Sequence, residues 1–368
     1  MDKIIRVSLV CLILMLLRPA STNATSSNED GNEYQSYQTG SECGADSDCP
    51  QLPPSIQPNE MNGNNLLSWK GNGVPVLEAG PGGSWDESGV IGPAVLHTWN
   101  NYLLWYSGIS EDTFQIGYAT SKNGLAWEKH PDNPVLTVGE PGSWDEQKVW
   151  APAVLHNSSI WEMWYVGYSD VTGSQIGYAT SLDGQNWVKY WDNPVLSPSF
   201  FDEWESSGLI SPHVLFENGL YHMWYSNDPQ GYIGYAVSSD GVHWERYPAN
   251  PLISPIGGDE DCSSVKFVSP TILHLEEYHM WYQAGQSCRG GVGGFWIVHS
   301  TSPDGVTWSD PEWVYGMGVG ISMNAHYPTV ISRHKGLLKQ MWYVYCGKIY
   351  YAEENQLNSR LFLPFTMH

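Results

Sequence analysis

Hydrophobic and polar positions alternate in short runs along most of the chain, and the same pattern returns five times. One unit reads MWYVGYSDVTGSQIGYATSLDGQNW (163–187), in which aromatic and β-branched runs are separated by Gly, Asn and Asp. Runs of this kind bounded by turn-forming residues are typical of strands, and apolar positions at helical spacing are absent. The pattern therefore predicts an all-β chain.

The repeat has a nearly constant length. The proline of a P-x-V/I core recurs at intervals of 59, 60, 58 and 58 residues, at Pro93, Pro152, Pro212, Pro270 and Pro328. Periods of this size indicate propellers or solenoids. Each unit contains four predicted strands, and the third and fourth are joined by Asp-Gly or Asn-Gly, which favours a tight hairpin because both residues tolerate positive φ. We predict a five-bladed β-propeller of four-stranded antiparallel blades.

The ends of the repeat region predict how the ring closes. The fifth unit stops after 348–354 and lacks its fourth strand, whereas 67–77 resembles the fourth strand and link at 186–196. An N-terminal strand that completes the last blade would remove a free sheet edge. We expect Leu66–Lys70 to pair beside Ile349–Ala352, within a propeller that spans 65–355 and is followed by a C-terminal tail at 356–368.

The first residues predict secretion. A basic start is followed by an apolar run of eleven residues at 7–17 and by small residues up to Ala24, as in a signal peptide covering 1–24. The run is too short to span a bilayer, which takes roughly 20 residues. The mature chain is therefore expected to be extracellular, with no membrane contact. The Ser-, Asn- and acid-rich stretch 25–64 predicts a polar flexible leader.

The cysteines agree with an oxidising compartment. Beyond the signal peptide, Cys43 pairs with Cys49 and Cys262 with Cys288 in the simplest scheme, which leaves Cys346 over, free or intermolecular. We expect a monomer, with a dimer through Cys346 as the alternative. Asn157-Ser-Ser is a glycosylation sequon between two predicted strands.

The net charge of −23 limits the partners. A nucleic-acid role is excluded because no basic patch is present to replace phosphate counterions. The same charge disfavours acidic polysaccharides, so neutral carbohydrate, cations or extracellular matrix are the expected partners; charge that simply keeps a secreted protein soluble is the alternative.

Residues that differ between the blades are the candidates for function, since whatever recurs in every blade serves the blade. Around the proline of each first strand, polar or aromatic side chains specific to one blade should meet near the axis. We predict that the substrate-binding residues are Trp150, His213, His326, Tyr327, Lys148, Lys266 and Asn324.

Three carboxylates stand at one position of the links, seven residues before the proline: Asp86, Asp145 and Glu205. As catalytic residues they would supply the acid and base of glycoside hydrolysis, at separations of roughly 6.5–9.5 Å for inversion or about 5–5.5 Å for retention. The alternative is that they cap turns, because Gly-Ser-Trp-Asp-Glu recurs almost intact in the first two blades.

The repeat P-x-V-L-H…M-W-Y-S-G…I-G-Y-A-T-S-x-D-G-x-x-W resembles the five-bladed propeller superfamily of arabinanases, β-xylosidases, levansucrases and invertases, over about 66–355. The resemblance implies an Asp, an Asp and a Glu at positions that are Gly92, Ala153 and Ile210 here. It also implies an axial calcium ion in some members, for which His326 is placed like their histidine. No other cofactor is expected.

Two functions remain open from the sequence. The first is a non-catalytic secreted propeller that binds carbohydrate or belongs to an acidic extracellular matrix, which the missing triad and the charge favour. The second is a glycoside hydrolase acting on a neutral arabinose-, xylose-, fructose- or galactose-type glycan, with Asp86, Asp145 and Glu205 as non-standard carboxylates.

Overall fold

The computed structural model describes residues 69–157, 159–199, 201–227, 229–258, 263–287, 293–314, 325–333 and 338–354. Several sequence predictions lie outside these residues: the signal peptide, the leader with Cys43–Cys49, the Cys262–Cys288 pair, Asn324 and the tail at 356–368.

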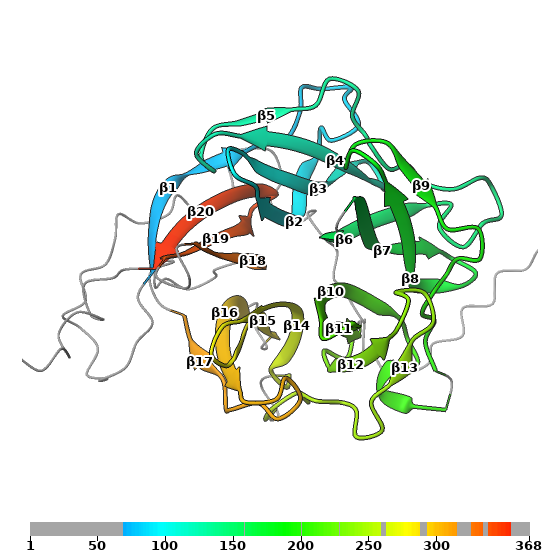
Figure 1. Cartoon of the computed structure of the whole chain (residues 1–368), viewed down its shortest axis with the longest axis vertical. Helices are drawn as coiled ribbons and strands as arrows, with labels where there is room; N and C mark the ends of the chain where they lie inside the picture. Colours follow the sequence, from blue (N-terminus) through cyan, green and yellow to red (C-terminus); the bar gives the residue numbers. More distant parts are fainter. Residues whose placement is uncertain are drawn as a thin grey trace, which may run out of the picture. The chain divides into compact units, whose positions relative to one another are not determined.

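The described residues form five blades of four antiparallel strands around one axis (Figure 1), and one parallel bridge between Phe114 and Lys148 joins the first two blades into a continuous sheet. The first blade contains β2 (Gly89–His97), β3 (Tyr102–Ser110), β4 (Thr113–Ser121) and β5 (Trp127–Lys129). The second contains β6 (Lys148–Asn157), β7 (Ile160–Ser169), β8 (Gly173–Ser181) and β9 (Trp187–Lys189). The third contains β10 (Leu209–Glu217), β11 (Leu220–Asn227), β12 (Ile233–Ser238) and β13 (Glu245–Arg246).

The fourth blade contains β14 (Lys266–His274), β15 (Tyr278–Ser287), β16 (Gly293–Ser302) and β17 (Glu312–Trp313). The fifth contains β18 (His326–Arg333), β19 (Leu338–Tyr345), β20 (Lys348–Glu354) and β1 (Trp69–Leu77). The first strand of each blade lies nearest the axis, so β2, β6, β10, β14 and β18 contact one another in a ring. The predicted five-bladed propeller is confirmed.

The ring closes through the N-terminal strand, as the sequence predicts. β1 pairs antiparallel with β20, from Trp69 opposite Glu354 to Leu77 opposite Ile349. The register differs from the expectation, because the residues facing Ile349–Ala352 are Gly71–Leu77 rather than Leu66–Lys70. Bulges in β1 near Pro75 account for the extra length of this strand.

Tryptophans of the second strands join successive blades. The indole Nε1 of Trp105 donates to the carbonyl of Gly184 in the next blade at 2.8 Å, and Trp164, Trp224 and Trp342 make the same bond to Gly241, Gly305 and Gly124. These glycines belong to the Asp-Gly and Asn-Gly turns. The turn therefore holds the neighbouring blade as well as its own hairpin.

The fifth junction lacks this bond. By the pattern of the other junctions, Trp281 would donate to the turn between the third and fourth strands of the last blade. The fourth strand of that blade is β1, which comes from the N-terminus, so the turn does not exist. The Nε1 atoms of Trp281 and Trp69 are accordingly buried without a hydrogen-bond partner among the described residues. The two rings pack edge to face at 6.2 Å instead.

The glycine of each Ile-Gly-Tyr sequence recurs because a tryptophan of the link lies on it. A Cβ atom at Gly177 would stand 2.7 Å from the Trp144 ring, and one at Gly117 would stand 2.6 Å from the Trp85 ring. Any side chain here would displace the link from its own blade.

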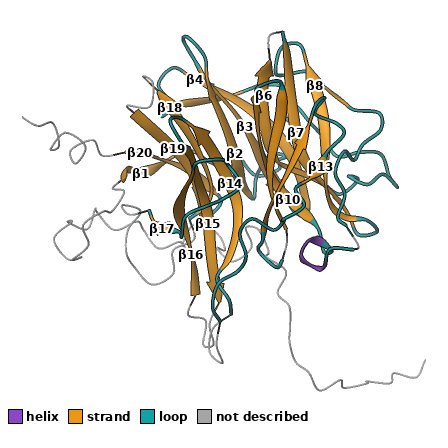
Figure 2. Cartoon of the chain, turned by 60° about the horizontal axis from the view of Figure 1, so that its bottom comes forward, coloured by secondary structure: helices purple, strands orange, loops and turns teal. Residues whose placement is uncertain are grey.

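The described helical structure is one short 3-10 turn, η2 (Glu203–Glu205), in the link before β10 (Figure 2). The part of the chain that the structure describes holds no helix with the length and apolar character needed to cross a membrane.

Cys346 lies in the tight turn between β19 and β20, and it is disulfide-bonded. The expectation that Cys346 is left over, free or available for a dimer, is therefore wrong. Asn157 ends β6 at the turn into β7, and its side chain hydrogen-bonds to Tyr221 of the next blade. Glycosylation of Asn157 stays a prediction.

Candidate functional site

Each innermost strand is interrupted by a bulge at its proline. The residue before the proline has positive φ in all five blades: 54° at Gly92, 50° at Ala151, 50° at Ser211, 58° at Ser269 and 48° at Tyr327. The pairing register shifts at the same place, between Ile91 and Ala94 in the first blade and at the matching pairs of the others. Positive φ is costly for residues other than glycine, so the surrounding ring must hold this conformation.

Hydrogen bonds between blades support the bulges. The amide of Ala151 donates to Ser107 Oγ of the first blade at 2.9 Å, and the amide of Ser269 donates to Ser226 Oγ of the third at 3.0 Å. The bulge divides the axial residues into two groups, one before the proline and one after it.

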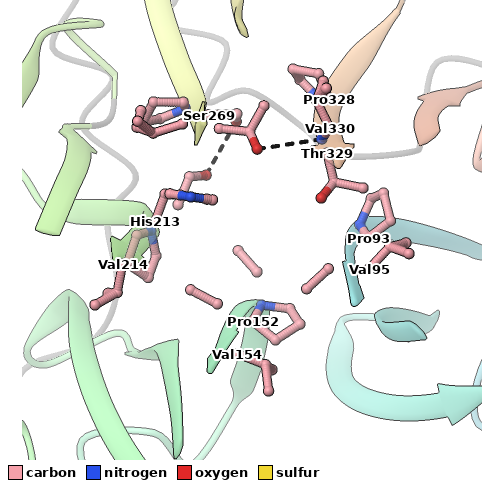
Figure 3. A pocket seen from close by; sticks show the side chains of 18 of the residues that line it. Pro93, Val95, Pro152, Val154, His213, Val214, Ser269, Pro328, Thr329 and Val330 are labelled. Atoms are coloured by element: carbon pink, nitrogen blue, oxygen red, sulfur yellow. Dashed lines mark hydrogen bonds between the residues drawn. The ribbon is translucent and has the colours of Figure 1, made fainter. Parts of the chain in front are cut away.

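The residues after each bulge line a cavity of about 160 Å³ on the axis (Figure 3). Its wall is mostly proline, alanine, valine, leucine and isoleucine, with Pro93, Pro152 and Pro328 around it. The lining residues with polar side chains are His213, Ser211, Ser269, Thr271, Thr329 and Tyr327. No carboxylate is among the described residues that line this cavity.

His213, predicted to bind substrate, lines this cavity from β10 (Figure 3). Burial lowers the pKa of its imidazole to about 4, against a smaller opposing effect of its hydrogen bond with the Ile272 backbone. The ring is therefore neutral at pH 7. Its Nε2 atom is buried without a partner among the described residues, so it remains available to hydrogen-bond a small molecule in the cavity.

The residues two before each proline form an apolar layer instead of an open funnel. Ile91, Trp150, Ile210 and Val268 belong to one hydrophobic cluster, together with Tyr327. Trp150 is 8% exposed and packs edge to face on Phe114 at 6.1 Å. The predicted binding residue Trp150 is thus part of the packing at the axis, whereas Tyr327 both packs against this cluster and lines the axial cavity.

His326, Lys148 and Lys266 lie at or near the starts of their strands, on the other side of the bulge from the cavity. His326 packs on the Phe295 ring at 4.5 Å, and burial lowers its pKa to about 4. Lys148 Nζ stands 4.8 Å from the centre of the Phe114 ring, which holds the cation beside an aromatic face. A Cβ atom at Gly231 would stand 2.3 Å from Lys266 Cβ, so Lys266 lies directly against the backbone of that turn.

The three link carboxylates turn toward their own blades. Lys129 Nζ lies 2.6 Å from Asp86, and Lys189 Nζ lies 2.6 Å from Asp145. Arg246 Nε lies 2.5 Å from Glu205. Each cation comes from the fourth strand of the same blade.

A tyrosine of the second strand completes each of these pairs. Tyr106 donates to Asp86, Tyr165 to Asp145 and Tyr225 to Glu205. The carboxylates are 2%, 3% and 0% exposed, and none is among the residues that line the axial cavity. Burial raises the pKa of Glu205, although Arg246 opposes this. This geometry favours a structural role, although the carboxylates bind side chains of their own blades instead of capping turns as the alternative predicted.

The residues on the axis do not fit the calcium ion that the resemblance implies. Calcium takes six to eight oxygen ligands, mostly carboxylates, carbonyls and water. His326 faces an aromatic ring, and no cluster of three His, Cys, Asp or Glu side chains occurs among the described residues. Calcium binding through His326 therefore receives no support from the described geometry.

Two features of the site were missed by the sequence reasoning. Lys or Arg follows the fourth-strand tryptophan by two positions in three blades, and this recurrence could have been paired with the link carboxylates. Phe114 and Phe295 flank Lys148 and His326, but their link to these residues depends on how adjacent blades meet.

Comparisons with known proteins agree with the fold. No family model matches the chain. An uncharacterized protein of Mycobacterium tuberculosis is 29% identical over 234 residues, which cover 60% of this chain and 75% of the relative.

A 1,2-β-oligomannan phosphorylase of Thermoanaerobacter is 29% identical over 127 residues, which cover 31% of this chain and 42% of the enzyme. A β-1,2-mannobiose phosphorylase of the same organism is 27% identical over 108 residues, 25% of this chain and 34% of the enzyme.

Solved structures match over most of the ring. A glycoside hydrolase superposes with a TM-score of 0.57 at 19% identity, over 77% of this chain and 91% of its own. A structure from a study of GH130 enzymes that target β-1,2-mannosidic linkages in Candida mannan superposes with a TM-score of 0.57 at 16% identity. The match covers 82% of this chain and 96% of that structure's chain. The chain thus has the five-bladed propeller fold of glycoside hydrolases and mannoside phosphorylases.

Proposed function

We propose that this protein acts on the glycosidic bond of a neutral β-linked glycan, with β-1,2-linked mannosides as the first candidates. The observation that carries the proposal is the sequence similarity to two phosphorylases of β-1,2-mannosides, in a chain whose fold matches glycoside hydrolases over three quarters of its length. This replaces the arabinose-, xylose-, fructose- and galactose-type glycans expected from the sequence.

The side of the axis where the first strands begin is the proposed substrate site. Lys148 and Lys266 place two ammonium groups there in a chain of net charge −23. Phosphorolysis requires an inorganic phosphate that attacks the anomeric carbon, and lysine is a point charge suited to hold it. Phe114, which is 5% exposed, and Phe295 pack beside Lys148 and His326 and would hold these two side chains in position.

The test is incubation of the purified protein with β-1,2-mannobiose and longer β-1,2-mannooligosaccharides, with and without inorganic phosphate. Release of mannose 1-phosphate only in the presence of phosphate would identify a phosphorylase, and release of free mannose in its absence would identify a hydrolase. Lys148→Gln should raise the KM for phosphate, whereas Lys348→Gln, which removes a surface cation paired with Glu78, should leave it unchanged.

A second candidate function is carbohydrate binding without catalysis. It is favoured by one observation: Asp86, Asp145 and Glu205 are engaged in ion pairs inside their blades. Binding of mannooligosaccharides measured by calorimetry, with no turnover under either condition, would support this candidate. If the protein shows no turnover and no binding, both candidate functions are contradicted.

The cellular setting is also a proposal. The apolar N-terminal run and small residues at 1–24 support secretion, and the acidic composition would suit an extracellular matrix. Detection of the mature chain beginning after Ala24 in culture medium would test the first point.

A further inference from the structure

A second pocket lies at the seam between the last and first blades, away from the axis. Its volume is about 510 Å³, within the range of roughly 300–1,000 Å³ typical of small-molecule sites. None of its lining residues lines the axial cavity. Those that carry the argument are Lys70, Tyr102, Lys122, Arg333, Gln340 and Tyr351.

The floor of this seam pocket is buried and polar. Tyr102, Gln340 and Tyr351 are 2%, 5% and 7% exposed. Arg333 Nη1 donates to the Tyr102 hydroxyl at 2.6 Å, and that hydroxyl donates to Gln340 Oε1 at 2.9 Å. Gln340 Nε2 then donates to the Tyr351 hydroxyl at 2.8 Å. The chain of hydrogen bonds fixes the orientation of these groups before any ligand binds.

The rim of the seam pocket is cationic. Lys70 and Lys122 are exposed at its edge, and Arg333 is half-buried beside the floor. Glu353 is the acidic residue among the described lining, opposite Lys70 in the β1–β20 register. Arg333 and Lys122 have neutral partners, Tyr102 and the Asn101 side chain, and no carboxylate pairs with them among the described residues. Most guanidinium donors of Arg333 are thus not used by an acid of the described chain.

Two other junctions carry the opposite charge at the corresponding place. Where the third blade meets the second, the Tyr221 hydroxyl binds Glu162, and where the fourth meets the third, the Tyr278 hydroxyl binds Glu217. At the seam, the tyrosine in this position meets an arginine and a neutral amide. Two blades can therefore pack together without a cation beside this tyrosine, so packing alone does not account for Arg333.

We propose that the seam pocket binds a monosaccharide unit that carries a carboxylate or a phosphate. The fork of Arg333 matches either anion, and Lys122 adds a second charge within the same pocket. Gln340, Asn123 and the tyrosine hydroxyls provide partners for sugar hydroxyls. The acidic composition predicts neutral glycans for the chain as a whole, but the fold gathers three cations from three separate segments at this one place.

The experiment is calorimetric titration of the purified full chain with glucuronate, mannose 6-phosphate, inorganic phosphate and methyl mannoside. We expect one or both acidic sugars to bind, and methyl mannoside to bind at least about tenfold more weakly at this site. Lys122→Gln should reduce the affinity for the acidic sugar about threefold to fivefold, because one exposed cation beside an anion contributes up to about 1 kcal/mol. Arg333→Gln should abolish binding. Lys122 is exposed, so its substitution leaves the fold intact even if loss of Arg333 disturbs the buried floor.

Lys348→Gln is the matched control, since it removes one positive charge from the fifth blade, outside the pocket. Equal affinity for methyl mannoside and the acidic sugars, or affinity unchanged by Lys122→Gln, would overturn the proposal, as would no binding of any probe. Inorganic phosphate binding as tightly as both sugars would show that the saccharide part is wrong. None of the proposed substrate-site residues Lys148, Lys266 and His326 lines the seam pocket, so variants of the seam pocket should keep any mannoside turnover, and the two proposals can fail separately.

Discussion

The ion pair between Lys189 and Asp145 should hold the second link to its blade, and Lys189→Met removes it. The Asp145 carboxylate is 3% exposed and accepts bonds from Lys189 Nζ at 2.6 Å, Tyr165 Oη at 3.3 Å and Ser143 Oγ at 3.1 Å. After the substitution, a buried negative charge keeps two neutral donors and loses its cation.

The expected cost follows from the burial of each partner. Breaking a fully buried ion pair by removing one partner costs roughly 3–5 kcal/mol. The Lys189 side chain is 27% exposed, so solvent screens part of this interaction, and we expect a loss of about 2–3 kcal/mol. In a domain of this size such a loss lowers the Tm by roughly 4–6 °C.

The assay is thermal unfolding followed by tryptophan fluorescence for the wild type, Lys189→Met, Asp145→Asn and the double variant. Removing the carboxylate charge together with its cation should recover much of the loss, which a double-mutant cycle measures. A Tm change of less than about 1 °C in Lys189→Met would refute the structural role. So would an Asp145→Asn variant that loses mannoside turnover at an unchanged Tm, because the carboxylate would then act in catalysis.

Three further predictions concern the fold. Gly177→Ala should destabilise the second blade by at least about 2 kcal/mol, measured by urea unfolding, because a Cβ atom would stand 2.7 Å from the Trp144 ring. Burial lowers the pKa of His299 to about 3, with further lowering by His279 and Lys339, whereas the unfolded side chain titrates near 6.5. The unfolded state therefore takes up the proton first, and stability should fall as the pH drops from about 6.5 towards 3. His299→Gln should reduce this loss by about 1–2 kcal/mol between pH 7 and 5, provided that the variant folds. A chain that starts at Glu78 lacks β1, so it should unfold at a lower Tm than the intact ring. It should also self-associate, measured by size-exclusion chromatography, because the unpaired edge of β20 can pair with a strand of another molecule.

Repetition explains why the fold could be read from the sequence. Turn residues, tryptophans and prolines occupy the same positions in unit after unit, and each position makes a contact that every blade needs. The missing last strand and its match at 67–77 predicted the closure of the ring. The register of β1 differed from the expectation because bulges near Pro75 lengthen this strand, and bulges leave little trace in a pattern of hydrophobic residues.

The site was harder to predict, for a reason visible at Asp145 and Trp150. Both positions were correctly placed in the link and the first strand, but whether a side chain faces a cavity or its own blade depends on contacts between strands distant in sequence. Trp150 packs on Phe114 of the preceding blade, and Asp145 turns toward Lys189.

The sequence by itself determined the number of blades, their strand order and the strand that closes the ring, because these depend on periodicity and local turn chemistry. Only the tertiary structure decided where the charges meet. Arg333, Lys122 and Lys70 are far apart along an acidic chain, and closing the ring brings them around one pocket, since the electrostatic field at a site depends on distance in space rather than on composition.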